Sequence, residues 1–112
     1  MYPDFQKIKK TILGEKYDLS LVFVSAKKIQ ELNKIYRNIN KPTDILSFPL
    51  SNTSGEILIC KTETRKMMKE FGRKFDNFLT FLFIHGCVHL KGFDHGAKME
   101  KVEEKFRKNF GI

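Results

Sequence analysis

Three histidines are the residues of this 112-residue chain whose type and spacing suit chemistry: His85, His89 and His95. Residues four apart lie on one face of a helix, so His85 and His89 can direct both imidazoles at one point. Gly92 can end that helix in a left-handed turn, which lets His95 close a third corner of a tetrahedron. Three neutral nitrogens with an open fourth position are typical of a catalytic zinc site. The sequence therefore predicts that these side chains hold one Zn²⁺ ion.

The alternative is that His85 and His89 are hydrogen-bonded core residues and that His95 lies on the surface. A single histidine would fit that interpretation, but three at metal-ligand spacing beside a helix-ending glycine favour the metal. Asp94 is left with two roles, because its carboxylate can orient a ligand ring or simply support a turn. Cys87 lies about 200° around the helix from His85 and should point away from the metal.

The spacing of the histidines also matches the metzincin peptidase pattern H-E-x-x-H-x-x-G-x-x-H, except at one position. Gly86 stands where those peptidases carry a glutamate. That glutamate takes a proton from the metal-bound water, and glycine has no group that can do so. The sequence therefore disfavours peptidase chemistry, which only the geometry of the histidines supports.

Charge and composition narrow the classes of partner and compartment. The chain carries 21 Lys and Arg against 13 Asp and Glu, a net charge of +8, which favours a polyanion or an acidic surface as partner. An ordinary lysine-rich surface is the alternative. The basic residues are spread along the chain, so a folded basic surface is expected instead of a disordered basic tail.

The length suits a single domain, residues 1–112. Cys60 and Cys87 form no C-x-x-C pair, and both are expected to be small core residues. Charges in Met1–Lys10 argue against a secretory signal, and the longest apolar run, Phe78–Ile84, is too short to span a membrane. A cytoplasmic protein without a membrane partner is expected.

Helix and strand signals alternate through the first part of the chain. Pro3 and Asp4 should open a helix that stops at Gly14. Ser25 is suited to cap a second helix, which should fade before Pro42. The buried strand expected between them is Leu19–Val24, and the apolar residues of the second helix are Ile29, Leu32, Ile35 and Tyr36.

A strand pair and a third helix are expected next. Ile45–Phe48, stopped by Pro49, and Glu56–Cys60 are separated by a polar loop, which predicts an antiparallel pair. Thr62 or Thr64 is suited to cap the helix that follows. Its apolar side should carry Met67, Met68 and Phe71, and it should end near Gly72.

The two remaining helices include the one that carries the histidines. Asp76 or Asn77 should start a helix whose apolar residues, from Phe78 to Leu90, point in nearly every direction. Such a helix is buried all round in the centre of a domain. A final amphipathic helix is expected over Ala97–Phe110. It should present Met99, Val102, Phe106 and Phe110 to the core.

The stretch from His85 to His95 resembles the signature H-G-x-L-H-L-x-G-Y-D-H of the YbeY family. Leu32–Arg37 and Lys41–Pro49 are similar to the family's motifs L-N-x-x-Y/F-R and K-P-T-D-V-L-S-F-P, and Gly55–Ile59 is similar to its G-D-I-x-I strand. Order and spacing agree over roughly residues 19–111. The departures, Val88, Phe93 and Glu56 in place of Leu, Tyr and Asp, touch no expected ligand.

The resemblance implies a zincin-like (metzincin-like) α+β fold, in which helices pack on a small mixed sheet and a central buried helix carries the histidines. It implies one metal-dependent endoribonuclease domain that begins at the family's first helix. The implied function is cleavage of single-stranded RNA in rRNA processing, namely 16S rRNA 3′-end maturation and late-stage ribosome quality control. Implied partners are rRNA, the small ribosomal subunit and the assembly GTPase Era.

Arg37 matches the family's functional arginine, and the resemblance implies that it faces the metal groove together with the catalytic ligand His85. A guanidinium can clamp a phosphodiester bidentately and stabilise charge that grows on its oxygens. The metal would polarise a phosphoryl oxygen or lower the pKa of a bound water towards about 7. The residues leave two nucleophiles open, a metal-bound hydroxide and the RNA 2′-OH.

A non-enzymatic alternative stays open, because no residue is an obvious general base. In that alternative the protein is a zinc-stabilised ribosome-assembly factor that binds rRNA or an assembly GTPase, and the metal serves the fold.

Overall fold

Five helices and three strands follow one another along residues 4–112, the part of the chain that this computed structural model describes. Pro3, expected to open the first helix, lies outside the described residues. The elements in chain order are α1 (Phe5–Leu13), β1 (Asp18–Phe23), α2 (Ala26–Arg37), β2 (Ile45–Ser51), β3 (Ser54–Ile59), α3 (Lys61–Met68), α4 (Phe75–Leu90) and α5 (Ala97–Asn109).

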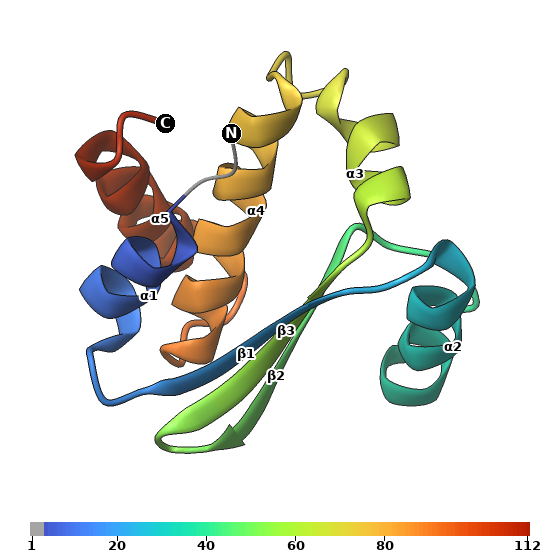
Figure 1. Ribbon diagram of the computed structural model, residues 1–112, viewed down its shortest axis with the longest axis horizontal. Helices are drawn as coiled ribbons and strands as arrows, with labels where there is room; N and C mark the ends of the chain where they lie inside the picture. Colours follow the sequence, from blue (N-terminus) through green and yellow to red (C-terminus); the bar gives the residue numbers. More distant parts are fainter. Residues whose placement is uncertain (1–3) are drawn as a thin grey trace.

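The strands form one mixed sheet in the order β1-β3-β2. β1 runs parallel to β3, and β2 pairs with β3 in the antiparallel hairpin that the sequence predicts. Figure 1 shows α1, α4 and α5 on one side of the sheet and α2 on the other. Alternate residues of β3 serve both layers: Ile57 and Ile59 join the core around α4, whereas Leu58 packs with Ile29 of α2. The α+β class is confirmed.

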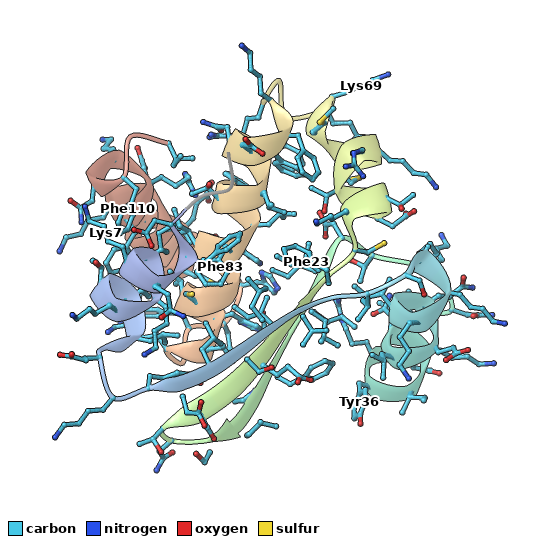
Figure 2. The ribbon with its side chains drawn as sticks, in the orientation of Figure 1. Lys7, Phe23, Tyr36, Lys69, Phe83 and Phe110 are labelled. Carbon is cyan, nitrogen blue, oxygen red and sulfur yellow. The ribbon has the colours of Figure 1, made fainter. Side chains whose placement is uncertain are left out.

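Local signals in the sequence explain where several helices begin. The Asp4 carboxylate accepts the amide N–H of Lys7 and the Ser25 hydroxyl accepts that of Lys28, both at 3.1 Å. These side chains satisfy amide groups that the first turn of a helix leaves without partners. α4 is apolar on all sides, as predicted, and is the central helix. Figure 2 shows Phe83 between α4 and α1, where its ring meets that of Phe5 at 4.7 Å.

Two strand predictions are wrong in part. β1 is a strand, but none of its residues is buried, because it lies at an edge of the sheet; Val22 and Phe23 are each 39% exposed. Pro49 does not stop β2, which continues to Ser51 with a register shift between Pro49 and Ser51. β2 is the other edge strand. An edge strand tolerates proline because its outer side pairs with no neighbouring strand, so the missing backbone N–H costs no hydrogen bond of the sheet.

Three helix predictions also need correction. Neither Thr62 nor Thr64 caps α3, which follows Cys60; the Thr64 hydroxyl instead donates back to the Cys60 carbonyl oxygen at 2.8 Å. α3 ends at Met68, so Phe71 lies beyond the helix and is 47% exposed. α4 begins at Phe75, before Asp76 and Asn77.

The apolar side predicted for α2 is only partly buried. Ile29 is fully buried, whereas Ile35 and Tyr36 are 71% and 64% exposed. The last turns of α2 therefore leave apolar side chains exposed, although the Tyr36 ring still contacts Phe48 of β2. Within residues 4–112, no helix is long and apolar enough to cross a bilayer.

Gly86 lets α4 approach the sheet closely, beside the two helical histidines. A Cβ atom at this position would lie 2.9 Å from Ile57 Cδ1, 3.0 Å from Ser47 Oγ and 3.1 Å from Ile45 Cδ1. All three distances are shorter than ordinary van der Waals contact. At the position where metzincin peptidases carry a glutamate, side chains of the sheet thus occupy the space that a Cβ atom would need.

The close contact at Gly86 predicts that Gly86→Glu destabilises the protein. The new side chain must displace buried neighbours or bury a carboxylate, so the free energy of unfolding should fall by roughly 3 kcal/mol or more. Gly86→Ala should cost less, because about 1 kcal/mol of helix propensity offsets its crowding. Urea denaturation measures both, and unfolding of both variants at the wild-type urea concentration would contradict this packing.

Candidate functional site

A cavity of about 410 Å³ brings together the residues that the sequence predicts to be functional. Its walls come from α4, from the loop after α4, from the edge strand β2 and from the last turn of α2. Figure 2 shows Tyr36 at that end of α2. The lining residues are Tyr36, Arg37, Ile45, Leu46, Ser47, Phe48, His85, His89 and His95.

Hydrogen bonds fix the rings of both helical histidines through Nδ1. His85 Nδ1 lies 2.6 Å from Glu103 Oε1, and His89 Nδ1 lies 2.9 Å from the carbonyl oxygen of Phe93. A carboxylate and a backbone carbonyl only accept hydrogen bonds, so the proton of each neutral ring sits on Nδ1. Both rings therefore carry their lone pair on Nε2, the form in which a histidine binds a metal.

A turn behind α4 supplies the third histidine. Gly92 has φ 111°, a value that favours glycine, and its N–H donates to the His89 carbonyl oxygen at 3.1 Å. The chain then folds back, which brings the Phe93 carbonyl to His89 and His95 to the same cavity. The predicted helix end at Gly92 and the gathering of the three histidines are both found in the structure.

The three rings surround one opening without closing into a complete ligand set. The centroid of the His95 ring is 5.4 Å from those of both His85 and His89, whereas His85 and His89 are 6.4 Å apart. Imidazoles bound at the tetrahedral angle to one zinc ion would have centroids roughly 5 Å apart. Accordingly, no group of three or more His, Cys, Asp or Glu side chains in residues 4–112 is set to hold a metal as it stands.

The donor set itself fits zinc. Three imidazoles line one cavity, two of them are held in the tautomer that leaves Nε2 free, and a carboxylate supports one of these. The widest pair, His85 and His89, has to close by roughly 1 Å, which is within the reach of side-chain rotation. The assignment of the three ligands therefore stays a prediction that the donor chemistry supports.

Glu103 is a residue of the candidate site that the sequence analysis missed. It lies on α5, its side chain is only 9% exposed, and it contacts the site through the bond to His85. A signal was present, because Glu103 falls at helical spacing between Met99 and Phe106, in a stripe that is otherwise apolar. Of the two roles left open for Asp94, its exposed position fits the turn residue.

The end of α2 places Arg37 in the cavity. Arg37 is the last residue of the helix, and Asn38 ends it in the left-handed conformation with φ 58°. Asn33, which is 2% exposed, ties the following loop to the helix, because its Nδ2 donates to the Lys41 carbonyl oxygen at 2.9 Å. Arg37, the arginine that the family resemblance singles out, thus shares a cavity with the three histidines.

Burial shifts the pKa of two groups near the site. It raises the pKa of the Asp44 carboxyl above its usual value, while hydrogen bonds from backbone amides and Thr43 partly oppose this rise. Burial also raises the pKa of the Cys87 thiol far above its usual range, so Cys87 stays neutral. Cys87 and Cys60 are fully buried, as predicted.

The side chains that line the cavity can bind an anionic ligand. One wall offers nitrogen lone pairs to a cation, and Arg37 offers a guanidinium that pairs with phosphate or carboxylate. The exposed ring of Tyr36 and the half-buried ring of Phe48, whose centroids are 5.0 Å apart, add a flat apolar surface to the same cavity.

Comparison with known proteins gives a consistent result. The family model described as Endoribonuclease YbeY matches residues 4–111. A protein named Endoribonuclease YbeY from Aliarcobacter butzleri is 44% identical over 103 residues, covering 80% of this chain and 74% of that protein. Another from Campylobacter jejuni subsp. jejuni serotype O:23/36 is 38% identical over 107 residues, covering 91% of this chain and 79% of that protein.

The fold agrees with a solved structure as well. The solution structure of TM1509 from Thermotoga maritima has a TM-score of 0.66 and 31% sequence identity to this chain, and the match covers 95% of this chain and 76% of that one. Together with the family model, which spans nearly all of the described residues, these matches show that the chain belongs to the endoribonuclease YbeY family.

Proposed function

We propose that the protein is a metal-dependent endoribonuclease that cuts single-stranded RNA during rRNA processing. Family membership supports the enzyme class and the RNA substrate. The observation that carries the proposal is the cavity in which Arg37 lies with His85, His89 and His95. The finer assignment is maturation of the 16S rRNA 3′ end and late-stage ribosome quality control.

The proposed cofactor is one Zn²⁺ ion held by His85, His89 and His95. When bound, the ion would supply Lewis-acid stabilisation of a phosphoryl oxygen. Glu103 and the Phe93 carbonyl hold two of the rings in the ligating tautomer. The central helix that presents His85 and His89 beside the sheet also supports the finer, zincin-like description of the fold.

Arg37 is proposed to bind the scissile phosphate and to stabilise the negative charge that grows on its oxygens. Its guanidinium can donate two parallel hydrogen bonds to a phosphodiester. Tyr36 and Phe48 support the preference for single strands, because unpaired bases can stack on aromatic rings whereas paired bases are already stacked.

The proposed partners are rRNA within the small ribosomal subunit and the assembly GTPase Era, and the proposed compartment is the cytoplasm. The net charge of +8 supports binding to an RNA-rich surface.

Gly86 favours a second candidate function, that of a zinc-stabilised ribosome-assembly factor without catalytic activity. Its contacts with the sheet leave no space for a base at that position. In this candidate the metal would contribute to stability, and Arg37 would not be needed for function.

The proposed chemistry predicts that zinc-loaded protein cleaves single-stranded RNA and that Arg37→Ala lowers the rate constant by roughly 100-fold or more. His85→Ala should abolish cleavage because it removes a ligand. Arg37→Ala should retain bound zinc and the wild-type melting temperature, since its side chain is exposed. A gel assay with a labelled oligonucleotide measures cleavage.

Arg65→Ala is the matched control, because Arg65 is an exposed arginine that stacks on Phe75 and does not line the cavity. It should cleave at the wild-type rate. Wild-type cleavage by both Arg37→Ala and His85→Ala would reveal a contaminating nuclease and contradict the proposal. A zinc-loaded wild-type protein that binds rRNA without cutting it would support the assembly factor instead.

The bond between Glu103 and His85 predicts that Glu103→Ala weakens zinc binding by roughly 10- to 100-fold. The loss arises because the His85 ring no longer has a carboxylate that fixes its orientation and tautomer. Glu104→Ala is the control, since Glu104 is an exposed neighbour that pairs with Lys108 at 3.5 Å. Competition with a chromophoric chelator measures both affinities, and equal zinc affinity in the two variants would argue against the role of Glu103.

A further inference from the structure

A second groove, of about 330 Å³, adjoins the cavity described above. The two share His85 and His95 as common walls. Arg37 and the aromatic pair of Tyr36 and Phe48 lie in the first cavity, whereas the second is lined by residues from α4, from α5 and from the loop after α3. A nucleic acid strand bound over the histidines can therefore extend from the cavity into the groove.

Phe71 gives the second groove an exposed aromatic surface. Its side chain is 47% exposed, although its ring lies 5.0 Å from that of Phe78, which is fully buried, and stacks on it at 27°. The Phe81 ring lies 5.5 Å from Phe71 and also lines the groove. Phe71 is thus supported from beneath by the core while part of its surface stays open to a ligand.

Two guanidinium groups lie over the Phe81 ring beside this aromatic surface. The Cζ atom of Arg73 is 4.7 Å, and that of Arg107 is 5.0 Å, from the ring centroid. Arg73 is held by a hydrogen bond of 2.6 Å to Asn77 Oδ1. Burial and the neighbouring charge of Arg107 lower the pKa of Arg73, which reflects two cations at close quarters. Arg73 Nη1 also donates to the Ile112 oxygen at 3.4 Å, so a bound anion is expected at Arg107, which lines the groove.

Two carboxylates also line the groove, and a carboxylate repels an anion that lies close to it. Glu103 is engaged by His85, and Glu100 is exposed in the first turn of α5. Arg107 lies two turns further along the same helix. A phosphate is therefore expected at the Arg107 end of the groove, away from Glu100.

We propose that this groove is a nucleotide-binding subsite for single-stranded RNA next to the cleaved bond. An unpaired base stacks on Phe71, and the phosphate of the same nucleotide pairs with Arg107. The subsite rests on the proposed endoribonuclease function and adds a substrate contact to it. Stacking is tolerant of base identity, because every base has a flat π-face, so the subsite selects unpaired nucleotides more than particular sequences.

The test measures binding of a fluorescent RNA of about eight nucleotides by anisotropy, with a gel showing that it stays intact. Phe71→Leu keeps an apolar side chain but removes the ring, and should weaken binding roughly 5-fold or more. Phe71→Trp keeps an aromatic ring and should bind the RNA as tightly as the wild type or more tightly. An oligomer of equal length without bases should bind wild type and Phe71→Leu equally, because it has phosphates and nothing to stack.

Arg107→Gln tests the phosphate contact separately. It should lower the slope of log Kd against log salt concentration by about 0.7, the value for one lost phosphate contact on a single strand. Arg65→Gln is the matched control. The Arg65 Cζ atom also lies over a phenylalanine ring, 4.5 Å from the centroid of Phe75, but Arg65 lines neither the cavity nor the groove. Phe23→Leu is the control for loss of an exposed ring. Both should bind RNA as the wild type does.

Wild-type RNA affinity in Phe71→Leu, or an equal loss for the RNA and the baseless oligomer, would overturn the stacking subsite. An unchanged salt slope in Arg107→Gln would overturn the phosphate contact. Either result leaves the proposed function standing if Arg37→Ala still slows cleavage as predicted above. Conversely, loss of stacking-dependent binding in Phe71→Leu together with an inactive zinc-loaded wild type would support the subsite and reject the enzyme.

Discussion

The hydrogen bonds at Nδ1 of His85 and His89 are the constraint on which the candidate site depends. They reach the rings from outside the helix that carries them, one from Glu103 on α5 and one from the Phe93 carbonyl in the turn. Each bond fixes a ring orientation and leaves Nε2 with its lone pair. A bond to an ionised carboxylate is roughly twice as strong as one between neutral groups, so Glu103 holds His85 firmly. The packing of α5 on α4 is therefore part of the site.

The packing of α4 against the sheet shapes the chemistry as well. Gly86 brings the helix so close to Ser47 and Ile57 that β2 becomes a wall of the cavity. The same closeness removes the position at which a peptidase would hold its base. In the proposed function, stabilisation of the growing negative charge then falls to Arg37, which reaches the cavity from the end of α2. A site of this kind is suited to a substrate that brings its own negative charge, as a phosphodiester does.

The sequence predicts what is local and misses what depends on distant contacts. The histidine helix and its end at Gly92 follow from spacing and from backbone preference within one short stretch. Glu103 was missed because its partner lies on another helix: its place in an apolar stripe marks it as buried but does not identify His85 as that partner. The exposure of Phe23 and the passage of β2 through Pro49 depend on which strands lie at the sheet edges, which short-range patterns do not report. Arg37 was found only through family resemblance, since one exposed arginine among 21 basic residues has no distinguishing local signal.

Nitrogen-15 NMR of the histidine side chains during a zinc titration tests the central claim most directly. Before zinc is added, His85 and His89 should carry their proton on Nδ1. As one equivalent of zinc binds, the Nε2 resonances of His85, His89 and His95 should shift together while the Nδ1 protons of the first two persist. Protons found on Nε2 of the metal-free rings, or zinc bound through Nδ1, would contradict the account.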